Sequence, residues 1–366
     1  MISKKITHLI TTIELGGAEK QLLILAANQI KQGLEVEVFY LKGEPELKSK
    51  FENLGVKVNS SLVNQPFIFQ VTKFRMFIRS NKSPVHTHLP QAELVASLAC
   101  KKKKFIISRH NFEPFWPKKP KLVSVLLSRF VTSRASSAIA ISNAIKNYLI
   151  MTKEVSKGFQ VSVVYYGCEQ EVDNQSNLKE LTHEILNSTK NYKLGTIGRL
   201  VPGKNYPTML KAIAKIVSVD PTVKFFVVGG GSSEQELIKL SKDLKIKDNV
   251  IWLGRTENIS EFLSKIDLFI FANKGEGFGL VLLEAMLANK PILAANNSAI
   301  PEVLGSNYKG LFSTDDYKLL ADKIVELIND HTKSESLVSE YKDQIKLFDP
   351  VDMADKVLKV YNLAGF

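Results

Sequence analysis

Short apolar runs that end in a turn and lead into an amphipathic stretch recur along almost the whole chain. In the first half these strand-like runs occupy residues 6–12, 36–41, 85–89, 105–108, 138–141 and 161–166, and in the second half 194–197, 225–228, 250–253, 268–271 and 292–295. Helical periodicity fills residues 18–31, 91–100, 122–132, 143–150, 206–217, 234–244 and 280–288. Strands that alternate with helices predict an α/β fold with parallel sheets covered on both faces.

The length of 366 residues exceeds what one hydrophobic core usually holds, so we expect two domains. A polar segment, 170–191, interrupts the alternation and predicts a linker between a first domain, 1–169, and a second, 192–349. Residues 350–366 predict an amphipathic helix that packs on either domain, including a return to the first. Two facing, doubly wound domains bind ligands in the cleft between them, at the carboxyl ends of their strands.

Two features predict the compartment. The chain has only two cysteines, Cys100 and Cys168, too few for a disulfide framework, which favours a reducing compartment. The N-terminus fits a first strand better than a signal peptide, and no uncharged apolar run approaches the ~18 residues of a membrane span. We therefore expect a cytoplasmic protein, either soluble or peripheral on the inner face of the membrane.

The run at 268–271 is followed by a glycine-rich loop and then by helical periodicity. Backbone N–H groups made accessible by Gly277 and Gly279 at the start of that helix are suited to binding phosphate oxygens. Glu276 lies in the loop, whereas Glu284 lies within the helix, where a carboxylate can accept hydrogen bonds from a ribose diol. Taken alone, this pattern also fits a capped helix with one glutamate at a buried edge.

Arg199 and Lys204 follow the strand-like run 194–197. A diphosphate leaving group gains negative charge as its bond to the transferred group breaks, and fixed cations beside it stabilise that charge. Arginine can grip two phosphate oxygens, whereas lysine acts as a point charge. The alternative is a pair of surface cations around a turn.

Histidines end two strands of the first half. His110 and Asn111 follow the run 105–108, and His86 and His88 end the run 85–89. The H-x-H spacing could suggest metal ligands, but no cysteine, aspartate or third histidine accompanies it locally, so we expect no metal there. Contact with an acceptor substrate, or packing at the strand end, fits His88 and Asn111 better.

Several segments together resemble the retaining family 4 glycosyltransferases of GT-B fold. The most specific is the motif Glu-Gly-Phe-Gly-x4-Glu-Ala at 276–285, joined by Gly-Arg-Leu and Lys204 within 195–205. The strand ends at 226–231 and 250–254, and the segments 291–294 and 300–303, agree in order and spacing. The resemblance is specific over 192–305. It is looser over the first 167 residues, where Leu-Gly-Gly-Ala-Glu at 15–19 resembles the family's first strand–helix turn.

This resemblance implies two Rossmann-like domains, the first binding the acceptor and the second the nucleotide-sugar. It implies transfer with retention of configuration, with no cofactor and no obligatory metal. The catalytic residues would be Glu276, His110, Arg199 and Lys204, with His110 shaping the orientation of the donor sugar. The donor-binding residues would be Gly16, Gly17, Arg199, Lys204, Gly254, Arg255, Glu276, Gly277, Phe278, Gly279, Leu280 and Glu284.

The sequence departs from the family at two places near the expected donor sugar. Ala272 and Asn273 stand where Pro-Ser is frequent, and Asn297 and Ser298 stand before Ala299 where a glycine pair is frequent. These departures bear on which sugar is bound and leave the nucleotide site untouched. By family frequency the nucleotide is UDP.

The charge is unevenly distributed. Residues 1–167 carry 25 Lys and Arg against 10 Asp and Glu, whereas the remainder carries 24 against 27. Cations interleaved with apolar residues at 74–79 and 117–130, and the run 101–104, are typical of segments that lie on an anionic membrane. A lipid-linked acceptor, a polyanionic glycan and simple solubility all fit this charge.

Other functions fit less well. The glycines at 16–17 and 229–231 lack the dinucleotide fingerprint, and neither a Walker A lysine nor a G-x-S-x-G elbow is present. No reading helix or stacking platform for nucleic acid can be identified. Two alternatives remain: a GT-B nucleotide-sugar epimerase, and a non-catalytic subunit that binds membrane or polyanions.

Overall fold

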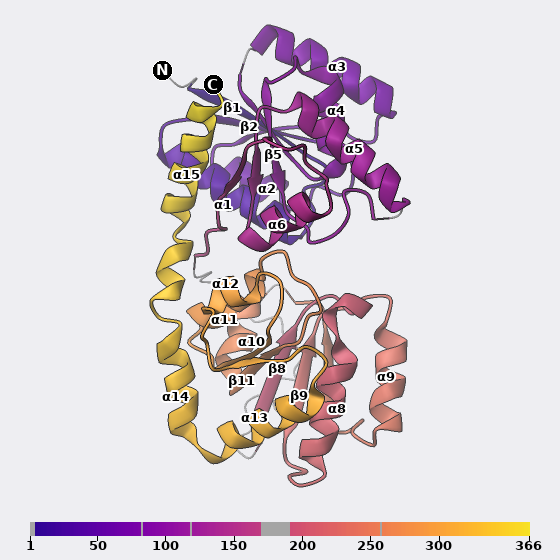
Figure 1. The fold of residues 1–366 in the computed structure, drawn as a ribbon, viewed down its shortest axis with the longest axis vertical. Coiled ribbons are helices and arrows are strands. Elements are labelled where there is room, and N and C mark those ends of the chain that lie inside the picture. The colour runs from indigo at the N-terminus through magenta and orange to yellow at the C-terminus, as the bar shows by residue number, and fades with distance from the viewer. Residues whose placement is uncertain (1–3, 82, 118, 170–190, 257) are drawn as a thin grey trace. The chain divides into compact units, whose positions relative to one another are not determined.

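The computed structural model describes residues 4–366 except 82, 118, 170–190 and 257. The chain divides into two compact units (Figure 1). Unit 1 comprises residues 1–168 and 348–366, and unit 2 comprises residues 169–347. The expected linker, 170–191, lies outside the described residues except for Asn191.

Unit 1 is built on a seven-stranded sheet in the order β3-β2-β1-β4-β5-β6-β7, with every neighbouring pair parallel. The chain runs outward from β1 in one direction and from β4 in the other, so the sheet has a topological switch point between these two strands. The strands are β1 (Lys5–Ile10), β2 (Glu35–Tyr40), β3 (Lys57–Asn59), β4 (Val85–His88), β5 (Phe105–Arg109), β6 (Ala138–Ala140) and β7 (Val161–Val163).

Helices cover both faces of this sheet because successive strand side chains point to opposite sides. Ile6 and Ile10 of β1 join the core beneath α1 and α15, whereas Leu9 joins the core beneath α3, α4 and α5. The helices of unit 1 are α1 (Gly17–Lys31), α2 (Lys48–Asn53), α3 (Phe67–Asn81), α4 (Pro90–Ala99), α5 (Lys121–Arg134), α6 (Asn143–Met151) and α15 (Pro350–Leu363).

The C-terminal helix α15 belongs to unit 1 although it follows unit 2 in the sequence. The Asp349 carboxylate caps its start by accepting from the N–H groups of Val351 and Asp352. Gly167 allows the close approach of this helix, because a Cβ there would lie 2.5 Å from the Pro350 Cα. The helix buries Tyr361 in the core of unit 1.

Unit 2 repeats the same topology with six parallel strands in the order β10-β9-β8-β11-β12-β13. Its switch point lies between β8 and β11. The strands are β8 (Lys193–Ile197), β9 (Lys224–Val228), β10 (Val250–Gly254), β11 (Leu268–Phe271), β12 (Ile292–Ala295) and β13 (Leu311–Phe312).

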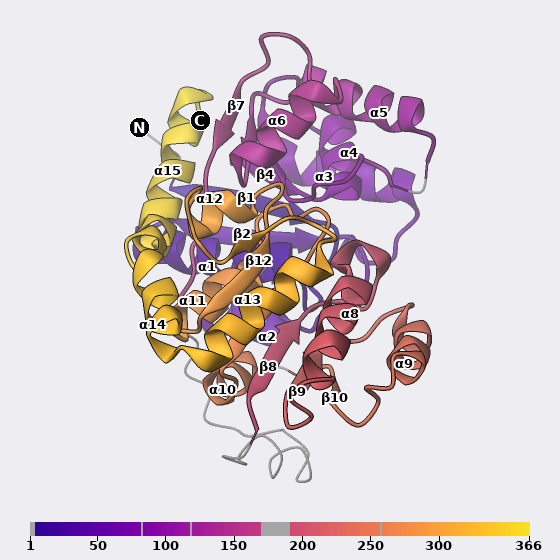
Figure 2. The same cartoon turned by 60° about the horizontal axis from the view of Figure 1, so that its bottom comes forward.

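The longer helices of unit 2 are amphipathic and bury their apolar faces against the sheet. Figures 1 and 2 show α8 and α13 side by side. The helices are α8 (Tyr206–Val217), α9 (Glu234–Asp243), α10 (Ile259–Lys265), α11 (Leu280–Leu287), α12 (Ile300–Leu304), α13 (Tyr317–Asn329) and α14 (His331–Glu340), with 3-10 turns η1 (Pro202–Lys204) and η2 (Gln344–Phe348).

The observed elements confirm the predicted α/β class, and the predicted strands and helices agree with them to within a few residues. The sequence patterns did not reveal the edge strands β3 and β13 or the helices α2, α3, α10, α12, α13 and α14. Edge strands of two or three residues are too short to show an alternation. Within the part of the chain that is described, no helix is both long and apolar enough to span a bilayer.

Candidate functional site

The loop that follows β8 carries Arg199, and glycines hold this loop against its neighbour. The Leu200 N–H donates to the Gly230 carbonyl (3.0 Å). A Cβ on Gly229, which has φ of +135°, would lie 1.9 Å from the Gly198 carbonyl oxygen. The glycine run after β9 is therefore required for the close approach of its backbone to the backbone of the loop after β8. The Arg199 side chain on that loop is exposed.

The loop that follows β11 leads directly into α11. Gly279 caps this helix with φ of +93°, in the left-handed region that favours glycine. Leu280 is the first helical residue, and the Phe278 side chain is buried beside it. Glu284 lies in the second turn of α11 and is half-buried. The expected phosphate-binding backbone therefore starts a helix, as its glycine pattern predicts.

The structure brings Lys204 and Glu276 together at the switch point of unit 2. The Lys204 ammonium donates to Glu276 Oε2 over 2.6 Å, and the Asn273 amide donates to the same oxygen over 2.5 Å. The two charged side chains are about one-fifth exposed. Lys204 also lies over the Phe271 ring, 5.8 Å from its centroid. A cation and a carboxylate thus meet where open α/β sheets bind ligands.

The two departures from the family pattern form one hydrogen-bonded network with Glu276. Asn297 donates to the Asn273 carbonyl (2.8 Å), and the Glu276 N–H donates to Ser298 Oγ (2.8 Å). Ser298 in turn donates to Asn297 Oδ1 over 2.8 Å. The φ of Ser298, +47°, lies in the left-handed region that glycine adopts readily.

Of the other predicted donor residues, Gly254 and Arg255 also lie beside the glycine run. The Gly229 N–H donates to the Gly254 carbonyl (2.7 Å). Arg255 is exposed, and its Nε would lie 3.7 Å from a Cβ on Gly230. Arg199, Lys204, Arg255 and Glu276 thus all stand on loops that follow strands of unit 2.

Gly16 and Gly17, in contrast, belong to unit 1, where Gly16 caps α1 and Gly17 begins it. A Cβ on Gly16 would lie 2.3 Å from a Glu19 carboxylate oxygen, so glycine is needed at this turn. Glu19 accepts from Thr12 Oγ1 (2.7 Å), and burial raises the pKa of its carboxyl group. In unit 1 these two glycines therefore shape a strand–helix turn.

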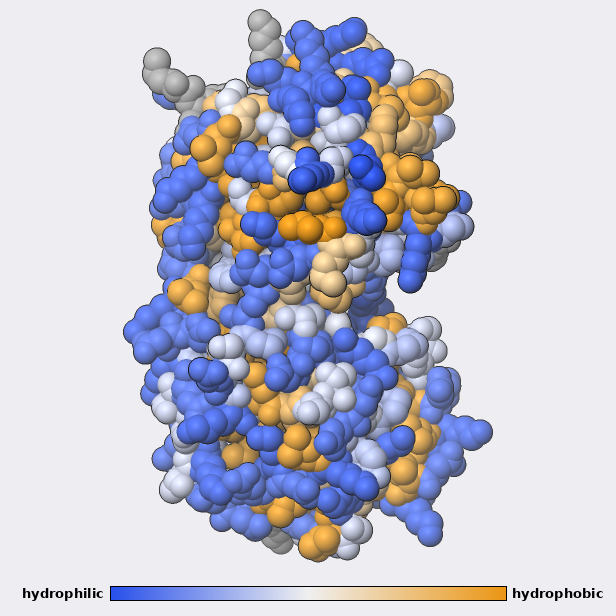
Figure 3. All heavy atoms as spheres, in the orientation of Figure 1, coloured by the Kyte–Doolittle hydropathy of each residue, from blue (hydrophilic) through white to orange (hydrophobic). Residues whose placement is uncertain are grey.

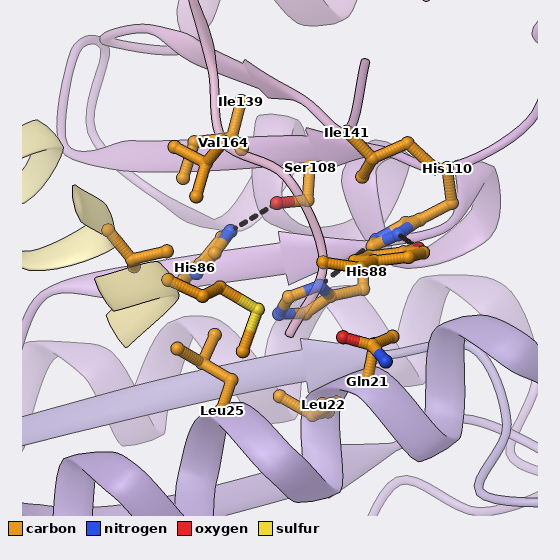
Figure 4. Close-up of a pocket in the computed structure, with 13 residues that line it drawn as sticks. Gln21, Leu22, Leu25, His86, His88, Ser108, His110, Ile139, Ile141 and Val164 are labelled. Atoms are coloured by element: carbon orange, nitrogen blue, oxygen red, sulfur yellow. Dashed lines mark hydrogen bonds between the residues drawn. The ribbon is translucent and has the colours of Figure 1, made fainter. Parts of the chain in front are cut away.

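His88 and His110 lie at the ends of β4 and β5 in unit 1. His110 Nε2 is 3.1 Å from His88 Nδ1, and His110 Nδ1 pairs with the Tyr166 hydroxyl. Both histidines line a small pocket of about 30 Å³ together with His86 and Ser108 (Figure 4). Burial, followed by the charge of Arg109, lowers the pKa of His110 to about 3. Asn111 is exposed next to them.

A buried ion triad holds the end of β5. The Arg109 guanidinium lies 3.0 Å from Glu93 and 3.2 Å from Glu154, and it stacks on the Phe115 ring at 4.6 Å. Glu154 also accepts from the Phe115 N–H (3.0 Å). Because this triad pins both the strand end and residue 115, it fixes the loop that carries His110 and Asn111.

The sequence analysis missed four side chains that contact the predicted histidines directly or through one another: His8, Gln29, Tyr166 and Tyr361. His8 carried a readable signal, since a histidine inside an apolar strand at an inward-facing position needs a buried partner. The other three come from separate helices and loops, and no local spacing connects them.

Comparison with known proteins matches both halves of the chain. The family model "Glycosyltransferase Family 4" matches residues 15–172, and the model "Glycosyl transferases group 1" matches residues 179–344. The first match falls almost wholly on unit 1, and the second lies within unit 2.

Individual relatives agree. The capsular polysaccharide biosynthesis glycosyltransferase CapM of Staphylococcus aureus is 28% identical over 219 residues, which is 57% of each chain. An α-1,4-N-acetyl-D-galactosaminyltransferase of Campylobacter jejuni is 28% identical over 347 residues, 89% of each chain. The chain spans little more than half the length of the first curated relatives that it matches.

The fold is also that of solved structures. Anabaena Alr3699/HepE, crystallised in complex with UDP and glucose, superimposes with a TM-score of 0.81 over 98% of this chain and 99% of its own, at 22% identity. At that identity the similarity concerns the fold alone. Two family models that together match most of the chain, and this shared fold, lead to one conclusion: the chain belongs to glycosyltransferase family 4 and has the GT-B fold.

Proposed function

We propose that this chain transfers a sugar from a UDP-linked donor to a glycan or lipid-linked acceptor with retention of configuration. The observation that carries the proposal is the pairing of Lys204 with Glu276 at the β8/β11 switch point, next to the glycine-rich start of α11. A diphosphate needs cations and backbone N–H groups, and a sugar needs a carboxylate. All three occur together there.

The roles of the residues follow from their chemistry. Lys204 and Arg199 neutralise the diphosphate as the bond between the sugar C1 and the phosphate oxygen breaks. The backbone at Gly277 and Gly279 binds phosphate oxygens, and Glu284 accepts from the ribose hydroxyls. Glu276, held by Lys204 and Asn273, orients the sugar. The acceptor oxygen bonds to C1 on the face that the diphosphate leaves, and its proton passes to the departing phosphate oxygen.

The identity of the donor is supported by relatives. The Anabaena protein was solved with UDP and glucose, and a Campylobacter jejuni relative is named as acting on a diphospho-undecaprenol acceptor. We therefore infer UDP as the nucleotide and a lipid-diphosphate-linked glycan as the acceptor class. With the cations of the protein beside the diphosphate, we expect neither a metal nor another cofactor to be needed.

We further propose that unit 1 rests on an anionic membrane through α3 and α5. Figure 3 shows hydrophobic atoms gathered over these helices at the upper right. The exposed fraction is 70% for Met76 of α3 and for Leu122 of α5. Lys73, Lys121 and Arg129, on the same helices, are exposed as well, although Lys118 lies outside the described residues. Apolar and cationic side chains on one surface are typical of interfacial binding.

This surface supports a location on the cytoplasmic face, because the inner leaflet carries negative charge. Neither cysteine forms a disulfide, which agrees with a reducing compartment.

The proposal is tested by thermal shift with UDP-, GDP- and ADP-sugars, followed by transfer assays with a lipid-diphosphate-linked glycan. Saturating UDP-sugar should raise the apparent stability by a few kcal/mol, more than the other donors do. Transfer should persist in EDTA, and activity that is lost and then restored by Mn²⁺ or Mg²⁺ would contradict the metal-free mechanism. An epimerase would release free sugar without an acceptor, and a non-catalytic subunit would turn over no donor.

A further inference from the structure

Four histidines of unit 1 are joined in one continuous chain of hydrogen bonds around the β1/β4 switch point. His8 comes from β1, His86 and His88 from β4, and His110 from the end of β5 (Figure 4 shows the last three). Gln29 of α1 and Tyr361 of α15 complete the chain. The contacts are His8 Nε2 to Gln29 Oε1 (2.8 Å), His8 Nδ1 to His88 Nε2 (3.0 Å), His88 Nδ1 to His110 Nε2 (3.1 Å), His110 Nδ1 to the Tyr166 hydroxyl, Gln29 Nε2 to the Tyr361 hydroxyl (3.2 Å), His86 Nδ1 to the Tyr361 hydroxyl (2.8 Å) and His86 Nε2 to Ser108 Oγ (2.7 Å).

The histidines in this chain are neutral because they are buried. His8 and His88 are at most 2% exposed, and burial lowers the pKa of all four rings well below the ordinary value. A neutral imidazole has one N–H donor and one acceptor nitrogen. Each ring in the chain must therefore donate on one side and accept on the other, so the tautomer of one ring dictates that of the next.

The orientation of the Gln29 side-chain amide sets the direction in which each hydrogen bond of the chain is donated. Its Oε1 accepts from His8, so His8 carries its proton on Nε2 and accepts at Nδ1. His88 must then donate through Nε2 to His8 and accept at Nδ1 from His110. His110 donates through Nε2, and its Nδ1 accepts the Tyr166 hydroxyl proton.

The hydrogen bonds form two branches that start at Gln29. The second branch, which runs through Tyr361 and His86 to Ser108, follows the same rule as the first, which runs through His8, His88 and His110 to Tyr166. The Gln29 amide N–H donates to the Tyr361 oxygen, and Tyr361 donates to His86 Nδ1. His86 then donates through Nε2 to Ser108. All four histidines thus carry the proton on Nε2. The first branch has a single alternative in which every ring carries it on Nδ1, because a mixed branch would place two donors or two acceptors face to face.

We propose that Gln29, His8 and His88 are positioning residues that together fix the tautomer of His110. Through this chain they commit the Tyr166 hydroxyl proton to His110, so Tyr166 meets any further group as an acceptor. In the reversed chain Tyr166 would accept from His110 and donate outward instead. The hydrogen-bonding character of Tyr166 would then be set four hydrogen bonds away, by Gln29 of α1. This role in the reaction rests on the proposed function, whereas the tautomers do not.

A metal ion is the competing explanation, since nitrogens of His8, His86 and His88 lie within 4.8 Å of one another. Each ring nitrogen of these residues already has a hydrogen-bond partner. An ion would have to break that chain. Zinc bound tightly by the purified protein, with loss of the predicted N–H signals, would overturn the proposal.

The test is NMR on protein labelled with ¹⁵N and ¹³C in histidine, which reports each tautomer directly. Only six histidines are present, and His331 is exposed. The wild type should show His8, His86, His88 and His110 as neutral Nε2–H tautomers at pH 7. Any mixture within the branch from His8 to His110 would overturn the proposal, and this measurement needs no variant.

Gln29→Met removes the acceptor of His8 and leaves a buried N–H without a partner, which proteins rarely tolerate. We expect His8, His88 and His110 to switch together to Nδ1–H. Gln29→Leu has the same expectation if Q29M folds poorly. Ser108→Ala is the matched control, because it removes a buried partner at the far end of the other branch and should leave the His110 tautomer unchanged. A switch of one ring alone, or none, contradicts the chain.

Transfer assays separate positioning from structure. Q29M should lower kcat by about 10²-fold, the lower end of what a positioned proton donor or acceptor contributes at a reaction site. The KM for the donor should change less than kcat, since we place the nucleotide on unit 2 and expect His110 to act on the orientation of the donor sugar. The turnover of S108A gives the reference for general damage to the cluster. If the tautomers switch in Q29M but its kcat is no lower than that of S108A, the positioning role would be overturned. A wild type that transfers no sugar would refute the proposed function instead, while the tautomers are measured separately.

Discussion

Units 1 and 2 share one topology but place different chemistry at their switch points. Around β1 and β4, unit 1 gathers the buried histidines His8, His86 and His88, and a chain of hydrogen bonds joins them to the half-buried His110. At β8 and β11, unit 2 gathers charged side chains that remain partly or fully exposed. The same strand topology therefore carries a preorganised polar network in one unit and exposed charged side chains in the other.

This difference has a physical cause. Buried polar groups must satisfy one another, so the histidines of unit 1 form a closed chain with defined directions. Exposed cations keep their hydration and can exchange it for phosphate oxygens at low cost. Variants of unit 2 should therefore act on binding and turnover, whereas changes in unit 1 should act through protonation and tautomer.

The largest effect is expected from removing the cations of unit 2. Arg199→Ala and Lys204→Ala should each lower kcat by roughly 10²-fold or more, because a preorganised charge beside the leaving group is lost. Circular dichroism and the apparent Tm should stay near the wild-type values. Lys274→Ala is the control, since Lys274 is exposed on the neighbouring loop after β11 and pairs with Asp315 (3.1 Å). Unchanged transfer in either R199A or K204A would remove that residue from the mechanism.

A smaller effect is expected from Glu284→Ala, which should weaken UDP binding measured by calorimetry. A hydrogen bond from ribose to a charged acceptor contributes about 1.5–3 kcal/mol, or roughly ten- to hundredfold in Kd. Glu335→Ala serves as the control, because Glu335 is exposed on α14 of the same unit. Equal affinities for UDP in E284A and wild type would assign Glu284 a structural role.

The pH dependence should separate the two units. Burial lowers the pKa of His8 to about 4 and of His110 to about 3, whereas an unfolded histidine titrates near 6.5. Below pH 6.5 the unfolded chain binds protons that native unit 1 does not. Its free energy of unfolding should therefore fall with decreasing pH, by up to about 1.4 kcal/mol per pH unit for each such histidine. Above pH 6.5 this dependence should vanish.

Glu93 works in the opposite direction. Burial raises its pKa to about 7 despite the Arg109 charge, so below pH 7 the native state binds a proton more readily than the unfolded state. Burial raises the pKa of Glu19 as well, and four lowered histidines outweigh these two raised glutamates, so acid should still destabilise unit 1. The chain has two tryptophans, Trp116 in unit 1 and Trp252 in unit 2. In denaturant unfolding between pH 5 and 7, Trp252→Phe leaves Trp116 as the fluorescent reporter of unit 1, and Trp116→Phe leaves Trp252 as the reporter of unit 2. The free energy of unfolding should fall more steeply with decreasing pH for unit 1 than for unit 2. Equal slopes for the two units would contradict this expectation.

The sequence predicted the fold well because the repeating period of strands and helices is a local signal. The glycine loop before α11 was equally readable, since Gly279 needs its left-handed φ of +93°. The coupling of Asn273, Ser298 and Glu276 was not readable, because it depends on how two loops meet in space. The same holds for Tyr361, which reaches His86 from a helix 275 positions later. Spacing along a chain predicts local turns but not such distant partners.

The smallest effect on turnover is expected from the cationic run Lys101–Lys104, whose side chains are all exposed on unit 1. If unit 1 rests on an anionic membrane, flotation with liposomes should increase with acidic lipid and decrease with salt, because exposed charges are screened within about 10 Å at 0.1 M. Replacing all four lysines with glutamate should weaken flotation while hydrolysis of the nucleotide-sugar stays near normal.

The matched control replaces Lys239, Lys242, Lys245 and Lys247 of unit 2 with glutamate, because these lysines are also exposed and give the same change in charge. If net charge alone drove association, both quadruple variants would lose it equally. The membrane proposal would fail if the wild type did not float with liposomes at low salt yet was fully active on a water-soluble acceptor. The charge of unit 1 would then serve solubility or the binding of a soluble polyanion.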